Sequence, residues 1–415
     1  MPMSVPSFLA QDARLCPSRR AFLAGAGSLV AWANMPRAGF AGTADPRFVL
    51  VILRGAMDGL AAVPPVGDRD YAALRGDLAL GADGSEILPL DDLFALNDAM
   101  PKLHRRMRKG EALIVHAAAT PYRERSHFDG QDVLESGLVG PRGSQDGWLN
   151  RVAAALPAGD RARPTQGLAV GATVPLILRG DAPVLTWSPP SMKQAGSDTV
   201  QRLASLYGET DAELSRVFTA GVELDELAMG VPMDDAGEKR RNGLASSFIA
   251  LAEGSGRLIA EDDGPRLAAI SYDGWDTHAA EGAADGRLAV LLDALDSSLD
   301  ALAGQLSAVW SQTVVAVVTE FGRTARANGN KGTDHGTATT AFLMGGAVKG
   351  GRVIADWPGL RTRDLYEERD LQPTTDLRAV LKGVLRDHLG IDQRTLATRI
   401  FPDSIGLKPL DGLIV

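Results

Sequence analysis

Continuous apolar runs recur along this 415-residue chain and are separated by polar and helix-like stretches. The first run, FVLVILRG at 48–55, ends in glycine and has the composition of a strand buried on both faces. Four later runs have the same character and lie at 112–118, 266–274, 313–322 and 339–346. The pattern therefore predicts five buried strands.

Helical periodicity appears between and after these runs. Leucines recur every three or four positions from Leu288 to Leu306, as on the buried face of an amphipathic helix. The segment 374–390 has the capping residues and the terminal glycine of a second helix. Polar helical stretches fill about 190–262, which we interpret as a helical insertion. Because strands alternate with helices, we predict an α/β fold with a central, mostly parallel sheet.

The first 41 residues have the features of an export signal. Arg19 and Arg20 precede a mildly apolar stretch at 21–33, and small residues stand before a cleavage point after Ala41. This order predicts a twin-arginine signal at 1–41, the twin-arginine translocation machinery as a partner, and a periplasmic or secreted protein. Residues 42–415 would then form a single domain. No other apolar run reaches about 18 residues, so we predict no membrane span in the mature protein.

The overall charge limits the partners. The chain has 23% charged residues, a net charge of −9 and a pI of about 5.3. It shows no basic stripe, so nucleic acid is not an expected partner. An anionic substrate would need a positive group to draw it into an acidic protein, and a metal ion would serve.

Polar clusters adjoin each predicted strand. RGAMDG lies just past the first strand, RSHFDGQD past the second and YDGWDTH past the third, while TEFGR ends the fourth and GTDHG precedes the fifth. Ligands of parallel α/β sheets bind outside the carboxyl ends of the strands, so we expect these clusters to meet there. The candidate metal ligands are Asp58, His127, Asp276, His278, Glu320, Asp334 and His335.

These residue types suit metal-assisted hydrolysis. Carboxylates and imidazoles bind divalent ions such as zinc, manganese or magnesium, and one or two ions could be held. Ser126 is the candidate nucleophile, since a nearby metal lowers the pKa of a hydroxyl. Arg323 could hold a phosphoryl or sulfuryl oxygen. Purely structural roles are the alternatives for some of these residues. Asp58 could serve only a turn, and Glu320 with Arg323 could form a structural ion pair.

The motifs RGAMDGL, RSHFD, GWLNR, GWDTH, TEFGRT, GTDHG and GGRVIADWPGL together resemble an exported bacterial family, the domain of unknown function 1501, over nearly the whole mature chain. That family is similar to the alkaline phosphatase and sulfatase superfamily. The resemblance implies a three-layer sandwich, a two-metal site with Asp58, Asp276, His278, Glu320 and His335 as ligands, and a nucleophile at Ser126. The chain departs from the superfamily in three places: the spacing of GWDTH, the lack of a histidine beside Glu320, and the missing formylglycine motif.

The resulting hypothesis is an exported metal-dependent hydrolase of phosphate or sulfate esters, with an anionic ester of, for example, an envelope or extracellular polymer as substrate. The alternative is a non-catalytic envelope or assembly protein that keeps a hydrolase-like fold and at most a structural metal. The missing histidine beside Glu320 favours the alternative, and the intact Ser126 and Arg323 favour the hydrolase.

Overall fold

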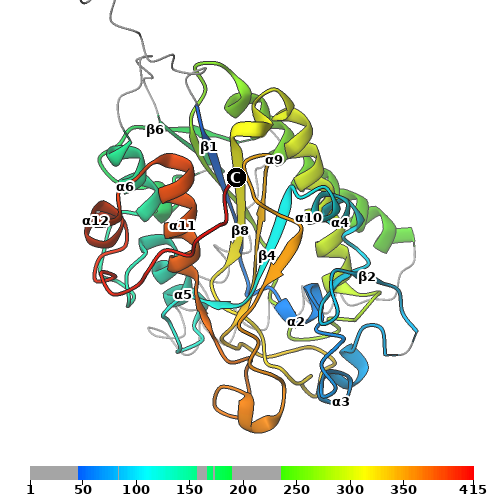
Figure 1. Cartoon of the computed structure of the whole chain (residues 1–415). Coiled ribbons are helices and arrows are strands. Elements are labelled where there is room, and N and C mark those ends of the chain that lie inside the picture. The colour runs from blue at the N-terminus through cyan, green and yellow to red at the C-terminus, as the bar shows by residue number, and fades with distance from the viewer. Residues whose placement is uncertain (1–44, 83, 157–165, 172, 189–234) are drawn as a thin grey trace, which may run out of the picture. The chain divides into compact units, whose positions relative to one another are not determined.

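A central sheet with helices on either side organises the described part of the chain (Figure 1). The computed structural model describes residues 45–82, 84–156, 166–171, 173–188 and 235–415. The predicted signal at 1–41 lies outside the described residues, as does most of the predicted insertion at 190–262. The last part of that insertion is helical, within α9 (Asp235–Ala260).

The central sheet contains nine strands among the described residues, in the order β10-β4-β9-β8-β1-β7-β5-β6, with β11 paired to β4. Its strands are β1 (Arg47–Leu53), β4 (Ala112–Ala119), β5 (Gly167–Val170), β6 (Val184–Trp187), β7 (Leu267–Tyr272), β8 (Thr313–Thr319), β9 (Thr339–Met344), β10 (Arg352–Ile354) and β11 (Thr375–Asp376). A separate antiparallel pair joins β2 (Ile87–Pro89) to β3 (Ala95–Asn97). All five strands expected from the apolar runs are therefore confirmed.

All strand pairings in this sheet are parallel except those of β9. β1 pairs in parallel with β7 and β8, whereas β9 is antiparallel to both β8 and β4. The first residue of β9 consequently lies at the end of the sheet where its neighbours finish. The loop before β9 can therefore reach the same edge as the loops that follow β4 and β8.

The sheet is covered on both faces, which makes the fold a three-layer α/β sandwich and confirms the predicted class. Along β1, Val49, Val51 and Leu53 join one apolar core, while Phe48 and the other alternate residues join the second. The first core includes residues of α4 (Pro101–Arg108), α9 and α10 (Arg287–Gln305). The second includes residues of α5 (His127–Ser136), α6 (Trp148–Ala155), α11 (Leu377–Leu389) and the π-helical turn η5 (Leu396–Ile400).

The two helices predicted from periodicity and caps are confirmed. The leucine stripe forms the buried face of α10, which packs against α9. Helix α11 begins at an Asp376 cap, whose side chain accepts a hydrogen bond from the Arg378 N–H, and ends at Gly390 in the left-handed conformation with φ 70°.

Short elements complete the described chain. They are α2 (Gly59–Ala62), α3 (Tyr71–Arg75), α12 (Gln393–Thr395) and the 3-10 turns η1 (Gly76–Leu78), η2 (Leu176–Leu178), η3 (Ser307–Gln312) and η4 (Thr362–Asp364). Of the helices in the described ranges, none has both the length and the apolar character needed to cross a bilayer.

Candidate metal centre

Four of the predicted ligands meet beyond the sheet edge where β4, β7 and β8 end. His127 begins α5, after β4, and Asp276 and His278 lie on the loop after β7. His335 lies in the loop before β9, and the antiparallel direction of that strand returns it to the same edge. The chain also needs a glycine here: Gly55 has φ 117°, and a Cβ on it would lie 2.5 Å from the Asp276 backbone nitrogen.

The converging atoms are three imidazole Nε2 nitrogens and one carboxylate. His335 Nε2 lies 2.9 Å from His127 Nε2 and 2.9 Å from His278 Nε2. One oxygen of Asp276 is 3.2 Å from His278 Nε2 and 3.3 Å from His335 Nε2, and the other is 3.4 Å from His127 Nε2. The ligand atoms of His127, Asp276 and His335 all lie within 4.8 Å of one another. We call these four residues the His3Asp centre.

Each imidazole is held through its other nitrogen. His127 Nδ1 lies 2.7 Å from a Glu320 oxygen, and His335 Nδ1 donates to the Arg125 carbonyl at 2.8 Å. His278 Nδ1 faces an Asp334 oxygen at 3.4 Å. Acceptors at Nδ1 assign its proton there and leave Nε2 with a lone pair in the neutral ring. Metal-binding histidines are oriented by such partners.

This donor set fits a cation. In the neutral rings, the Nε2 lone pairs of His127 and His335 would face each other at 2.9 Å, and such an approach needs positive charge between or beside them. The Asp276 carboxylate beside them adds a negative ligand atom. A divalent ion held by His127, Asp276 and His335 would satisfy these three groups at once, and His278 adjoins them through His335 and Asp276.

The ionisable groups of the centre shift one another's pKa values. Burial lowers the pKa of His127, but hydrogen bonds and charge from Asp276 and Glu320 outweigh it and raise that pKa to about 9. Burial opposes ionisation of Glu320, yet the hydrogen bond and charge of His127 lower its pKa to about 2. Burial likewise opposes ionisation of Asp276, and bonds from His127 and His335 with the charge of Arg323 hold its pKa well below the usual range. The metal-free centre therefore keeps a proton on His127.

That proton makes metal affinity depend on pH. An entering ion must displace it, so we expect the apparent affinity for zinc to rise about tenfold per pH unit from neutrality and to level off near the His127 pKa of about 9. Competition with a chromophoric chelator at a series of pH values measures this. Glu320→Gln removes one of the carboxylates that raise the pKa of His127, so the plateau should begin at lower pH, with affinity reduced roughly 10–100-fold. A flat profile through this range would contradict the assignment.

Glu320 and Asp334, both predicted as ligands, lie outside the converging atoms. Glu320 is fully buried and accepts hydrogen bonds from the Gly55 N–H and the Gln131 amide as well as from His127. The Asp334 side chain is 51% exposed and lies beside Nδ1 of His278. Each thus contacts the far side of an imidazole and orients it.

Arg323, predicted to hold a substrate anion, points inward. Its side chain is fully buried, and its Nη1 donates to Asp276 at 2.5 Å. Its Nε donates to the Thr333 hydroxyl at 3.1 Å, and its Nη2 donates to the Thr333 carbonyl. The guanidinium therefore fixes Asp276 in the centre and has no surface left for a substrate.

Asp58, another predicted ligand, is engaged elsewhere. It caps α2 by accepting from the Leu60 and Ala61 N–H groups, and its second oxygen accepts from Arg75 at 2.5 Å. Glu281 lies 4.0 Å from the same guanidinium, and all three side chains are buried. Arg75 and Glu281 lower the pKa of Asp58 against the effect of burial, whereas burial and the charge of Asp58 raise that of Glu281 well above normal. A guanidinium thus supplies the positive charge that Asp58 needs.

Ser126, the predicted nucleophile, is the N-cap of α5. Its backbone N–H donates to the Tyr122 hydroxyl at 3.1 Å, and its Oγ accepts from the Asp129 N–H at 3.5 Å. Arg125, just before it, has φ 60°, which is an unusual conformation for a residue with a side chain. Such backbone strain collects at functional sites. The Ser126 hydroxyl therefore stands in the chain between the strained Arg125 and His127 of the centre.

Sequence reasoning missed three supporting residues. Arg125 is fixed by ion pairs to Glu367 at 2.5 Å and to buried Asp370 at 2.9 Å, and its carbonyl holds His335. Phe321 stacks on His127 with ring centroids 5.0 Å apart. The sequence offered one signal for each of these two residues, its position inside a polar motif. Phe321 follows Glu320 in TEFGR, and Arg125 begins RSHFDGQD. Nothing in the sequence pointed to Asp370.

No curated protein matches the chain. Among solved structures, Ps i-CgsB in complex with k-i-k-neocarrahexaose is similar at 11% identity and a TM-score of 0.41, over 88% of this chain and 77% of that one. A putative sulfatase from Bacteroides thetaiotaomicron is similar at 9% identity and a TM-score of 0.39, over 88% and 75% of the two chains. An alkaline phosphatase superfamily protein from Vibrio parahaemolyticus is similar at 11% identity and a TM-score of 0.35, over 75% and 62%.

A family model matches more than half of the chain. The model described as a protein of unknown function (DUF1501) matches residues 111–400, which include the strands β4 to β9 and every residue of the His3Asp centre. The resemblance inferred from the motifs is thereby confirmed, and this chain belongs to the DUF1501 family.

Proposed function

We propose that this protein is a metal-dependent hydrolase of phosphate or sulfate esters. One observation carries the proposal: the ligand atoms of His127, Asp276 and His335 all lie within 4.8 Å of one another, and Nε2 of His278 adjoins them. Partial exposure, 38% for the His278 side chain and 26% for that of His335, leaves the centre accessible from solvent. A bound divalent ion would supply Lewis acidity and draw charge from an ester oxygen.

The donor set favours zinc or manganese, and a single ion. Imidazole ligands suit zinc and manganese better than magnesium, which prefers carboxylates and water. Because Arg75 already neutralises Asp58, we infer one tightly held ion per chain in place of two. Arg323 keeps Asp276 ionised and oriented toward it.

Two further groups of the chain would serve the reaction. Ser126 would supply the nucleophilic hydroxyl, since Arg125 and His127 on either side of it are both tied to the centre. Arg369 would attract the anionic ester in place of buried Arg323. Its side chain is 39% exposed, and its Nη1 donates to the His335 carbonyl at 2.8 Å.

Turnover of p-nitrophenyl phosphate and p-nitrophenyl sulfate tests the proposal. Zinc- or manganese-loaded protein should cleave at least one of them, and chelated protein should not. Ser126→Ala should lower the rate about 10³-fold or more if the hydroxyl attacks. Ser126→Asn is the matched control, because asparagine keeps the capping acceptor without a hydroxyl. It should fold normally and be equally inactive. An unchanged rate in both variants would exclude Ser126 as the nucleophile.

A second function is favoured by the number of donors. With His278 as a fourth protein ligand, the coordination of zinc would be complete, as in structural sites, and the protein would then be a non-catalytic envelope or assembly component. Cobalt-loaded protein separates the two functions. Inorganic phosphate or sulfate should alter its visible spectrum if a coordination position is open, and should leave the spectrum unchanged if the site is closed.

We also propose that the protein is exported through the twin-arginine route and acts in the periplasm or outside the cell, on an ester of, for example, an envelope or extracellular polymer. The support is the sequence of residues 1–41. Amino-terminal sequencing of the exported protein checks this, because the mature chain should begin after Ala41.

A further inference from the structure

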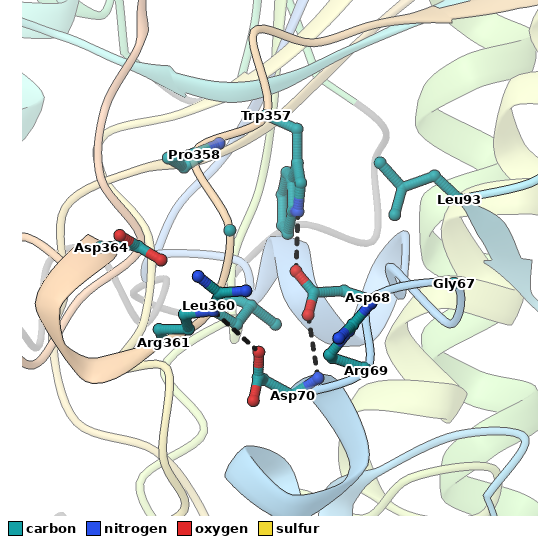
Figure 2. A pocket seen from close by; sticks show the side chains of 11 residues that line it. Gly67, Asp68, Arg69, Asp70, Leu93, Trp357, Pro358, Leu360, Arg361 and Asp364 are labelled. Carbon is teal, nitrogen blue, oxygen red and sulfur yellow. Dashed lines mark hydrogen bonds and ion pairs between the residues drawn. The ribbon is translucent and has the colours of Figure 1, made fainter.

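A pocket of about 400 Å³ opens between two loops that are far apart in the sequence (Figure 2). One loop, 67–70, leads into α3, and the other, 357–364, follows β10. None of the residues that line the pocket belongs to the His3Asp centre. Its volume lies within the roughly 300–1,000 Å³ usual for small-molecule sites.

Trp357 forms a fixed aromatic wall of this pocket. Its Nε1 donates to an Asp68 oxygen at 2.9 Å, as the dashed line in Figure 2 shows. Phe94 and His116 pack against its ring edge-on, with centroids 5.3 and 5.2 Å away. The other Asp68 oxygen accepts from the Asp70 N–H at 2.9 Å, so Asp68 is committed to holding the indole and the loop.

Charged groups of both signs surround the indole. Arg361 and Asp70 face each other at 3.8 Å, and their side chains are 52% and 41% exposed. Arg69 is exposed and makes no hydrogen bond or ion pair with any residue in the described ranges. Asp364 completes the polar lining at 29% exposure, and the guanidinium of Arg363 lies 3.6 Å from its carboxylate. Besides Asp68, two guanidinium groups and two carboxylates thus line the pocket beside one aromatic ring.

We propose that this pocket binds an uncharged, polyhydroxylated ring, that is, a neutral sugar unit. Hydroxyl groups both donate and accept, so such a ring can donate to Asp70 and Asp364 while it accepts from Arg69 and Arg361. The carbon–hydrogen faces of a sugar ring can lie against the indole, which is apolar in its body and already fixed at its polar edge.

Other ligand classes fit the lining less well. A strongly anionic ligand would meet the carboxylates of Asp68, Asp70 and Asp364, and a cation would meet the guanidinium groups of Arg69 and Arg361. An apolar ligand would leave these charged groups desolvated and without partners. The proposal does not rest on the hydrolase function, because it involves no residue of the centre.

Binding to an array of neutral, sulfated and phosphorylated oligosaccharides tests the proposal, followed by titration calorimetry with the best neutral binder. The full chain is used after chelation, so that anion binding at the metal centre does not contribute. Arg361→Ala and Arg69→Ala should each weaken neutral-glycan binding about tenfold or more, the usual effect of losing a charged hydrogen bond. Arg399→Ala is the matched control: Arg399 is an exposed arginine of η5 that does not line the pocket, so affinity should be unchanged.

Retained binding in chelated protein, lost in the two pocket variants only, supports the sugar site even if no ester is ever cleaved. The proposal is overturned if no neutral glycan binds, if only charged glycans or inorganic phosphate bind, or if Arg399→Ala weakens binding as much as Arg361→Ala. Both pocket variants alter exposed side chains, so they are expected to fold like the parent protein.

Discussion

His335→Ala should abolish tight metal binding and metal-dependent turnover together. His335 is central to the proposed ligand set, because its Nε2 lies 2.9 Å from the Nε2 atoms of both other histidines. Its removal should cost more than the roughly 10–100-fold in affinity that loss of an orienting partner costs. Elemental mass spectrometry should find about one equivalent of zinc or manganese in the parent protein and almost none in the variant.

The matched control is His104→Ala. His104 lies on α4, and its Nε2 contacts the Pro89 carbonyl, so this variant removes an imidazole away from the centre. Its metal content should equal that of the parent. Two equivalents in the parent would contradict the role given to Arg75, and a full equivalent retained in His335→Ala would contradict the centre itself.

Arg75→Met should lower the free energy of unfolding by about 3–5 kcal/mol, because it leaves the buried Asp58 carboxylate without a cation. Methionine fills a similar volume, so loss of packing contributes little. Urea titration of chelated protein measures the change without any contribution from bound metal. Asp411→Asn, which breaks the exposed Arg386 pair, should cost no more than about 1 kcal/mol.

The loss in Arg75→Met should also depend on pH. In the parent, the pKa of Asp58 is lowered below 3.8, so its contribution to stability is present above that value and disappears only as the pH falls through the lowered pKa. Without Arg75, burial raises the pKa of Asp58 instead, and the cost of burying its charge disappears as the pH falls. The two proteins should therefore differ less near pH ~4 than at pH ~7. An equal difference at both values would show that the pair is not the cause.

Sequence patterns predicted the sheet because its strands are buried on both faces and so appear as continuous apolar runs. They predicted His127, Asp276, His278 and His335 together because loops at one sheet edge must converge. They could not distinguish a ligand from the group that orients it: Glu320 and Asp334 carry the same carboxylate chemistry but lie on the Nδ1 side of an imidazole.

The remaining differences between the sequence predictions and the structure come from contacts between segments that are distant in the chain. The partner of Asp58 is Arg75, on α3, and the partner of Arg323 is Asp276, 47 positions away. The direction of β9 was not evident from its apolar run, and the pocket at Trp357 joins loops separated by most of the chain. Such pairings depend on packing that periodicity does not describe.

The convergence of His127 and His335 has a kinetic consequence, because these ligands are 208 positions apart in the chain. Closing a chain loop of that length is slow and costs conformational entropy. Contacts between residues so far apart in the sequence therefore form late in folding. His335 and His278, in contrast, are only 57 positions apart and can meet earlier. An ion would therefore bind with full affinity only after β4 has joined the sheet, and the binding free energy would act against release of β4 from it.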